Sequence, residues 1–261
     1  MSALTLQYKQ YSNTGSPVLV LHGLFGSQSN WGWQCKQLAQ SFSVYGVDLR
    51  NHGDSPHADA LDYPVMATDV LKLLDALALP SCSIVGHSMG GKVAMQLALT
   101  KPERIDKLVV VDIAPVDYAS TADGHLKVIA GMRSLDVANL TTRAEAEQQL
   151  GTVIDDEATR KFVLTNLLRD SAGGFKWRLN LDAIESNYDR LRAKPLASKS
   201  FDKPTLFIKG ALSNYIKAEH EAEIMELFPD AAVKVIMGAG HWVHAEKPQA
   251  LFKIVNDFLT D

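Results

Sequence analysis

The chain has 261 residues, of which 46% are apolar and 21% charged, and this is ordinary usage for a globular protein. Its net charge of −4 argues against a nucleic-acid partner. No apolar run approaches the ~20 residues of a membrane span, and no signal peptide pattern is present, so we expect no integral membrane association. Cys35 and Cys82 form no C-x-x-C or zinc pattern. We expect buried thiols and a cytoplasmic location.

The first part of the chain alternates short β-rich runs with helical patterns. Strands are predicted at residues 4–8, 17–21, 44–47, 82–85 and 108–111. Apolar residues at helical spacing follow Val70 and stop at Pro80, and another helix ends near Lys101-Pro102. This order favours a parallel sheet with helices on both faces.

The pattern then changes, and residues 117–203 show helical periods without a convincing strand. Apolar residues from Phe162 to Leu168 predict one helix, which Gly173-Gly174 ends. Strand patterns return at 205–208 and 233–236, before a C-terminal helix. We therefore expect a core of residues 1–116 and 204–261, interrupted by a helical cap segment of residues 117–203.

A candidate nucleophile follows the strand at residues 82–85. Gly86-His87-Ser88-Met89-Gly90 fits G-x-S-x-G, with a strand before it and a helix after it. The glycines are needed because a side chain at Gly86 or Gly90 would crowd the tight turn that lifts the serine hydroxyl clear of the backbone. The alternative is a glycine-rich helix start of any α/β protein, which the partner residues below disfavour.

A second glycine-rich turn, His22-Gly23-Leu24-Phe25-Gly26, follows an earlier strand. Acyl transfer builds negative charge on a carbonyl oxygen, which preset N–H donors stabilise. The amide of Met89, directly after the nucleophile, is one expected donor, and the amide of Leu24 is the other. Alone, the turn would be an ordinary loop, but beside Ser88 it predicts an oxyanion hole.

The base must come from eight histidines, which are His22, His52, His57, His87, His125, His220, His241 and His244. His241 follows the last strand, in Gly238-Ala239-Gly240-His241-Trp242, and a loop there reaches the sheet edge that carries Ser88. We expect His22 and His87 to make structural hydrogen bonds, and His244 to pack or cap. Surface exposure is expected of the histidines at 57, 125 and 220.

The acid is less obvious. A carboxylate is expected after the strand at residues 205–208, but Ser213 occupies that place in Gly210-Ala211-Leu212-Ser213. Asp112 ends the strand that follows the nucleophile's helix, at the same sheet edge, and is our preferred acid. Asp182 in the cap segment is the rival, with helix capping as its other role. Ser213 is expected to hydrogen-bond His241 or Asp112.

Taken together, these residues resemble the α/β-hydrolase superfamily over essentially the whole chain, and most closely the YbfF-type bacterial esterases. The resembling stretches are 22–27, 48–53, 86–91, 111–115, 174–182 and 238–248. The resemblance implies an eight-stranded, mostly parallel sheet with a small helical cap. It also implies hydrolysis of carboxyl esters or acyl thioesters without a cofactor. In such esterases the acid of the catalytic triad would be Asp112, and a serine would stand at the position of Ser213.

The expected reaction is acyl transfer from a small-molecule ester or thioester through an acyl-serine, with no metal and no cofactor. A dehalogenase or epoxide hydrolase of this fold would need an aspartate at position 88. A carbon–carbon bond hydrolase, a cofactor-free perhydrolase and a binding protein on a hydrolase scaffold stay open. Phe25, Trp177 and Trp242 are candidates for an apolar acyl pocket. Residues 176–203 carry seven Lys/Arg against four Asp/Glu, which predicts a solvated face or, less favoured, a site for the phosphates of an acyl-CoA.

Overall fold

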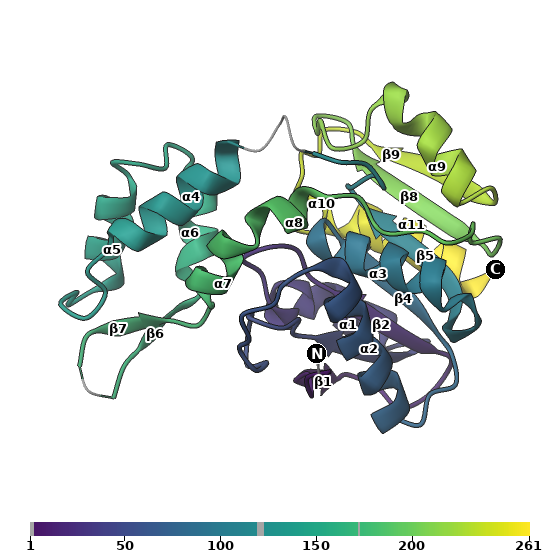
Figure 1. Cartoon of the computed structure of the whole chain (residues 1–261), viewed down its shortest axis with the longest axis horizontal. Coiled ribbons are helices and arrows are strands. Elements are labelled where there is room, and N and C mark those ends of the chain that lie inside the picture. Colours follow the sequence, from purple (N-terminus) through teal and green to yellow (C-terminus); the bar gives the residue numbers. More distant parts are fainter. Residues whose placement is uncertain (1–2, 119–122, 172) are drawn as a thin grey trace.

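The fold is built on a twisted, mostly parallel sheet, and the computed structural model describes residues 3–118, 123–171 and 173–261 (Figure 1). Within these ranges the sheet has seven strands in the order β1-β3-β2-β4-β5-β8-β9, so the eight strands implied by the resemblance are one too many. β1 pairs antiparallel with β3, and the other pairings are parallel. The strands are β1 (Tyr8–Gln10), β2 (Pro17–Leu21), β3 (Ser43–Val47), β4 (Cys82–His87), β5 (Ile105–Val111), β8 (Thr205–Gly210) and β9 (Ala231–Ile236).

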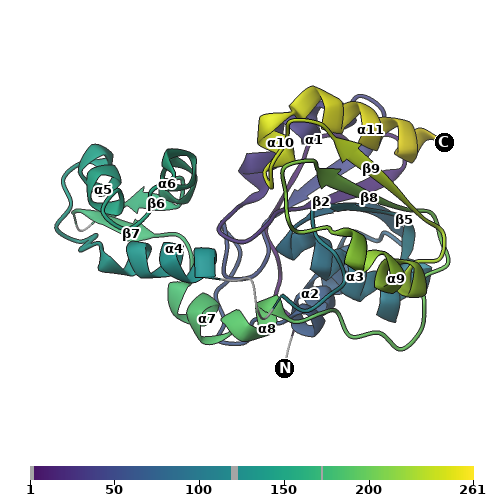
Figure 2. The ribbon, with the colours of Figure 1, turned by 90° about the horizontal axis from the view of Figure 1, so that it is seen from above.

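Helices cover both faces of this sheet, as the alternating sequence pattern predicts (Figure 2). One face carries α2 (Tyr63–Ala76), α3 (Met89–Thr100) and α9 (Glu221–Leu227). The other face carries α1 (Gly32–Leu38), α10 (Val243–Glu246) and α11 (Pro248–Thr260). Every residue of β4 is buried, which explains why a central strand reads as a continuous apolar run instead of an alternating one.

Residues 123–171 and 173–186 form a lobe beside the sheet, and the chain after them returns along the core to complete the cap segment (Figures 1 and 2). Its helices are α4 (Asp123–Ser134), α5 (Arg143–Leu150), α6 (Glu157–Leu164), α7 (Leu181–Ser186) and α8 (Tyr188–Arg192). The expectation that this segment contains no strand is wrong, because β6 (Leu167–Arg169) and β7 (Phe175–Trp177) pair as an antiparallel hairpin. The division into core and cap at residues 116 and 204 remains a prediction.

The glycine pair explains that error. Gly173 and Gly174 have φ angles of +104° and +66°, a conformation that glycine adopts readily, and they lie in the turn of the hairpin. A Cβ atom on Gly174 would lie 2.0 Å from the carbonyl oxygen of Ala138. The predicted helix from Phe162 to Leu168 therefore stops at Leu164, and Leu167 begins a strand.

Lys92 of α3 joins the cap segment to the core. Its buried ammonium group donates to the carbonyl oxygens of Val116 at 2.7 Å, Arg192 at 3.2 Å and Ala193 at 2.6 Å. Val116 precedes the cap segment, and the other two lie on its return to the core. Burial lowers the pKa of Lys92 to about 7, and the three carbonyl oxygens replace the water that a charged ammonium would otherwise hold.

Candidate active site

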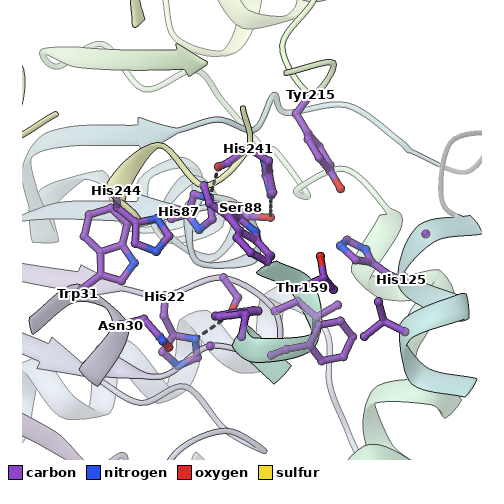
Figure 3. A pocket seen from close by; sticks show the side chains of 18 residues that line it. His22, Asn30, Trp31, His87, Ser88, His125, Thr159, Tyr215, His241 and His244 are labelled. Carbon is purple, nitrogen blue, oxygen red and sulfur yellow. Dashed lines mark hydrogen bonds between the residues drawn. The ribbon is translucent and has the colours of Figure 1, made fainter. Parts of the chain in front are cut away.

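Three side chains converge at the carboxyl edge of the parallel sheet. Ser88 directly follows β4, Asp112 directly follows β5, and His241 lies in the loop after β9. The carboxyl ends of parallel strands lie at one edge of the sheet, so residues far apart in the sequence meet there. The structure thus brings together the predicted nucleophile, acid and base (Figure 3).

Ser88 occupies a strained turn. Its φ of +50° and ψ of −118° lie outside the regions that residues with a side chain usually adopt, and its amide donates to Val111 O at 3.0 Å. The flanking glycines make room, because a Cβ at Gly86 would lie 2.4 Å from Gly90 O, and one at Gly90 would lie 2.5 Å from His22 O. The turn therefore directs the hydroxyl of Ser88, the residue just before α3, toward His241.

His241 lies between the serine and the aspartate. Its Nδ1 is 2.7 Å from Asp112 Oδ2, and its Nε2 is 3.1 Å from Ser88 Oγ. A carboxylate only accepts hydrogen bonds, so Nδ1 carries the proton and donates it. Nε2 is then the acceptor that faces the serine hydroxyl, which is the tautomer that a general base needs.

Asp112 is fully buried, and both of its carboxylate oxygens accept hydrogen bonds. The amide of Gly210 donates to Oδ1 at 3.0 Å, and the hydroxyl of Ser213 donates to Oδ2, the oxygen that His241 also contacts. Ser213 thus bonds the aspartate instead of the histidine. These contacts hold the carboxylate in one orientation toward the imidazole.

Asp182 lies elsewhere. Its carboxylate is 85% exposed and pairs with Arg133 at 2.6 Å on the cap segment. The capping role expected for it belongs to Asn180, whose side chain accepts the amide of Ala183, and Asp182 lies in the first turn of α7. Asp182 therefore has no contact with His241.

Of the two predicted oxyanion donors, Met89 directly follows the serine, and Leu24 lines the same cavity as Ser88. The amides of Leu24 and Met89 make no hydrogen bond within the described part of the chain. Phe25 has a φ of +62°, which turns the loop after Gly23, and a Cβ on Gly23 would lie 3.2 Å from Ser88 Cβ. The same Cβ would lie 2.9 Å from His87 Nδ1, so the close approach of the loop to the nucleophile favours glycine at position 23.

Two buried histidines hold this loop. Leu49 N–H donates to His22 Nε2 at 3.0 Å, and Phe25 N–H lies 3.3 Å from His52 Nε2. Each Nδ1–H then donates to a carbonyl, that of Gly23 for His22 and that of Arg50 for His52. Burial lowers the pKa of His22 to about 4 and that of His52 to about 3.

These two imidazoles predict acid sensitivity. The unfolded chain binds protons at both as the pH falls through about 6.5, whereas the folded chain stays neutral there until about pH 4 or below. Proton uptake then favours unfolding, so each histidine should lower the free energy of unfolding by about 2–3 kcal/mol between pH 7 and 4.5. Urea unfolding of wild type and His52→Gln measures this. Between pH 7 and 4.5, the free energy of unfolding of His52→Gln should fall by about 2–3 kcal/mol less than that of wild type. Equal decreases in the two proteins would contradict the lowered pKa of His52.

A cavity of about 340 Å³ opens beside the serine, and Figure 3 shows the side chains that line it. Of the predicted pocket residues, Phe25 and Trp242 line it. The expectation for Trp177 is wrong, because its indole lies outside this lining and donates to Met132 O at 3.2 Å within the cap segment. Trp177 lies on the hairpin that the sequence did not predict, so its position was misjudged.

Other lining residues had no distinct sequence signal. Val128, Thr159 and Phe162 reach the cavity from α4 and α6. The expected surface exposure of His125 and His220 is also wrong. His125 lines the cavity with its Nδ1 2.9 Å from the hydroxyl of Tyr188, and His220 is only 9% exposed. Both are ordinary helix residues in the sequence, and only the packing of distant elements reveals their environment.

The remaining site histidines pack as expected. His87 lies 2.9 Å from the carbonyl oxygen of His241 through Nε2, and His244 stacks on Trp31 with ring centroids 4.7 Å apart. Burial lowers the pKa of His244 to about 3, so it stays neutral. Among the described residues, no group of three or more His, Cys, Asp or Glu side chains is placed to hold a metal ion.

Comparisons with known proteins show the family to which the chain belongs. The model of a family described as alpha/beta hydrolase fold matches residues 16–248. The sn-1-specific diacylglycerol lipase ABHD11 of Mus musculus is 41% identical, with 93% of this chain and 80% of that protein covered. Esterase YbfF of Escherichia coli is 35% identical, with 98% and 97% covered.

A solved structure is similar over its whole length. The structure named "Marine microorganism esterase" is 40% identical, has a TM-score of 0.96, and covers 98% of this chain and 100% of its own. The chain is thus similar to proteins named as esterases and lipases. Within the described residues, no helix is both long enough and apolar enough to cross a membrane.

Proposed function

Since the chain belongs to the α/β-hydrolase family, we propose that it hydrolyses carboxyl esters through an acyl-serine formed on Ser88. The observation that carries this proposal is the hydrogen-bonded series from Ser88 through His241 to Asp112, with distances of 3.1 and 2.7 Å. A serine hydroxyl is a weak nucleophile by itself, and this series supplies the base and the buried charge that activate it.

In the first half of the reaction, Ser88 Oγ attacks the ester carbonyl carbon while His241 Nε2 takes the hydroxyl proton. Negative charge develops on the carbonyl oxygen, which the amides of Leu24 and Met89 stabilise. Asp112 stabilises the imidazolium. The bond to the leaving oxygen then breaks, and that oxygen takes the proton from His241.

In the second half, His241 Nε2 removes a proton from water as the water attacks the acyl-serine. The same two amides stabilise the second oxyanion, and Ser88 recovers its proton when the acid leaves. Every proton is returned, so the chain's own residues complete the cycle. An aspartate nucleophile, needed by an epoxide hydrolase or dehalogenase, is absent because position 88 is serine.

Acyl thioesters fit the same chemistry, because a thiolate leaves more readily than an alkoxide. The basic residues of the cap segment do not favour a site for coenzyme A phosphates. Five of the seven already pair with carboxylates, and these are Lys176, Arg178, Arg190, Arg192 and Lys194.

The proposed cytoplasmic location rests on Cys35 and Cys82, which are free and buried.

Reaction with a fluorophosphonate tests the proposal. An activated serine should be labelled at Ser88, and the labelled protein should lose all ester turnover. A parallel panel of acyl esters, acyl-CoAs and dienones separates ester hydrolysis from thioester and carbon–carbon bond hydrolysis. Failure of Ser88 to react would favour a binding protein on this scaffold.

A further inference from the structure

We propose that the chain prefers esters of short acyl groups with a bulky leaving group, because Ser88 stands between two cavities of different size and only the larger one adjoins the proton donor. This inference rests on the proposed function and defines its substrate class. The observations are the two cavities, their lining residues and the position of His241.

The second cavity has a volume of about 50 Å³, against about 340 Å³ for the first. Ser88, Leu24, His125 and Tyr215 line both. The other residues that line the small cavity are mostly apolar and aromatic, with Lys92 and Arg192 beside them, and they lie around the start of α3 and the return from the cap segment. They include Tyr63, Met89, Ile113, Tyr118, Tyr188 and Leu191.

Figure 3 shows how the larger cavity is arranged around the serine. Trp31 and His244 lie on one side of Ser88, and His125 and Tyr215 lie on the other. Since His125 and Tyr215 also line the small cavity, that cavity adjoins the second side. A substrate carbonyl at Ser88 can therefore place its two substituents in different cavities.

The proton transfer from His241 determines which cavity holds the leaving group and which holds the acyl chain. The leaving oxygen must receive a proton from His241 Nε2, so the leaving group must lie on the side of the imidazole. His241 and Trp242 line the larger cavity and not the small one. The alcohol or thiol part of the substrate therefore occupies the larger cavity, and the acyl chain occupies the small one.

Size then sets the acyl class. A cavity of about 150 Å³ holds one benzene molecule of six carbon atoms, so a cavity of about 50 Å³ has room for roughly two to three carbon atoms. That room suits acyl groups from acetyl to butyryl. The larger cavity has several times that room, which suits a bulky leaving group. Both cationic residues of the small cavity are already engaged, Lys92 by three carbonyl oxygens and Arg192 by Asp189, so we expect the acyl chain to be uncharged.

Leu191 is the residue with which to change the small cavity. Its side chain is 8% exposed and lines only the small cavity of the two. Its carbonyl oxygen accepts the hydroxyl of Tyr63, a backbone contact that a side-chain change preserves. Leu191→Ala removes three carbon atoms, and Leu191→Phe adds bulk. Phe162→Ala is the matched control, because Phe162 lines only the larger cavity and packs on Trp242 at 4.8 Å.

The experiment measures kcat/KM for two ester series with wild type and the three variants. One series holds the 4-nitrophenyl leaving group constant and lengthens the acyl chain from acetyl to decanoyl. The other holds acetyl constant and enlarges the alcohol. Wild type should favour acetyl or butyryl over decanoyl by at least about 100-fold, because even one or two misfit methylenes in a pocket cost roughly that much.

The variants should separate the two cavities. Leu191→Ala should raise the hexanoyl-to-acetyl ratio by roughly tenfold, and Leu191→Phe should lower the butyryl-to-acetyl ratio by a similar factor. Both should leave the ranking of alcohols unchanged. Phe162→Ala should change the ranking of alcohols and leave that of acyl chains unchanged.

The reverse pattern would overturn the assignment, as would a wild-type preference for decanoyl esters. Fluorophosphonate labelling of Ser88 in the same four proteins separates this failure from that of the proposed function. If Ser88 is labelled and decanoyl is preferred, the hydrolase stands and the cavity assignment falls. If wild-type Ser88 is not labelled, the proposed function itself falls.

Discussion

Ser88→Ala is expected to lower kcat for a short-chain ester by on the order of 10⁶, because removal of the nucleophile from a serine triad leaves only binding and oxyanion stabilisation. His241→Ala should cause a loss of similar order, since the serine and its base act as one unit. Steady-state assays on one ester measure both. Circular dichroism should show an unchanged fold in each variant.

Ser83→Ala is the matched control for this prediction. Ser83 lies in the same strand, β4, and is also buried, but it lies away from the sheet edge. Its loss should leave kcat essentially unchanged. More than about a hundredth of wild-type activity in Ser88→Ala, against the expected loss, would remove Ser88 from the mechanism.

Asp112→Asn is expected to lower kcat by roughly 10⁴, or about 5.5 kcal/mol. The amide keeps the shape of the carboxylate but removes the charge that stabilises the His241 cation. Its NH₂ group also favours the wrong imidazole tautomer at the 2.7 Å contact with Nδ1. The same ester assay measures the effect.

Two comparison variants make this prediction specific. Ser213→Ala removes one hydrogen bond to the charged Asp112 carboxylate, which is worth about 1.5–3 kcal/mol, or roughly a factor of ten to 150 in rate. Asp182→Asn should lower kcat no more than that, because Asp182 pairs with Arg133 on an exposed surface. If Asp182→Asn lost most of its kcat while Asp112→Asn kept nearly the wild-type kcat, the cap segment would supply the acid of the triad.

The core of the fold could be predicted from the sequence because the patterns that indicate its strands and turns are formed by residues close together in the chain. Buried parallel strands appear in the sequence as continuous apolar runs. Two of these runs are directly followed by a candidate catalytic residue, Ser88 or Asp112. The strand order and the glycine-rich turns then place those residues at one edge of the sheet. Asp112 could be chosen over Asp182 because its place in the topology is fixed by a strand end.

The cap segment was less predictable, for a physical reason. Leu167 and Leu168 fit a helical period as well as a short strand, and only the φ angles of Gly173 and Gly174 reveal the hairpin. Trp177 was therefore misplaced. The division of space around Ser88 into two cavities also depends on packing between α3, α4, α8 and the loop of Tyr215, and no local pattern encodes such packing.

The central claim is that the acyl group is transferred to Ser88, and rapid-quench mass spectrometry tests it most directly. The protein is mixed with 4-nitrophenyl acetate, quenched in acid within the first turnover, digested and sequenced. The account predicts one acetyl group on the peptide that contains Ser88, which appears with the first equivalent of nitrophenol and is absent in Ser88→Ala. Rapid turnover of the ester with the acetyl group on another residue, or on none, would contradict it.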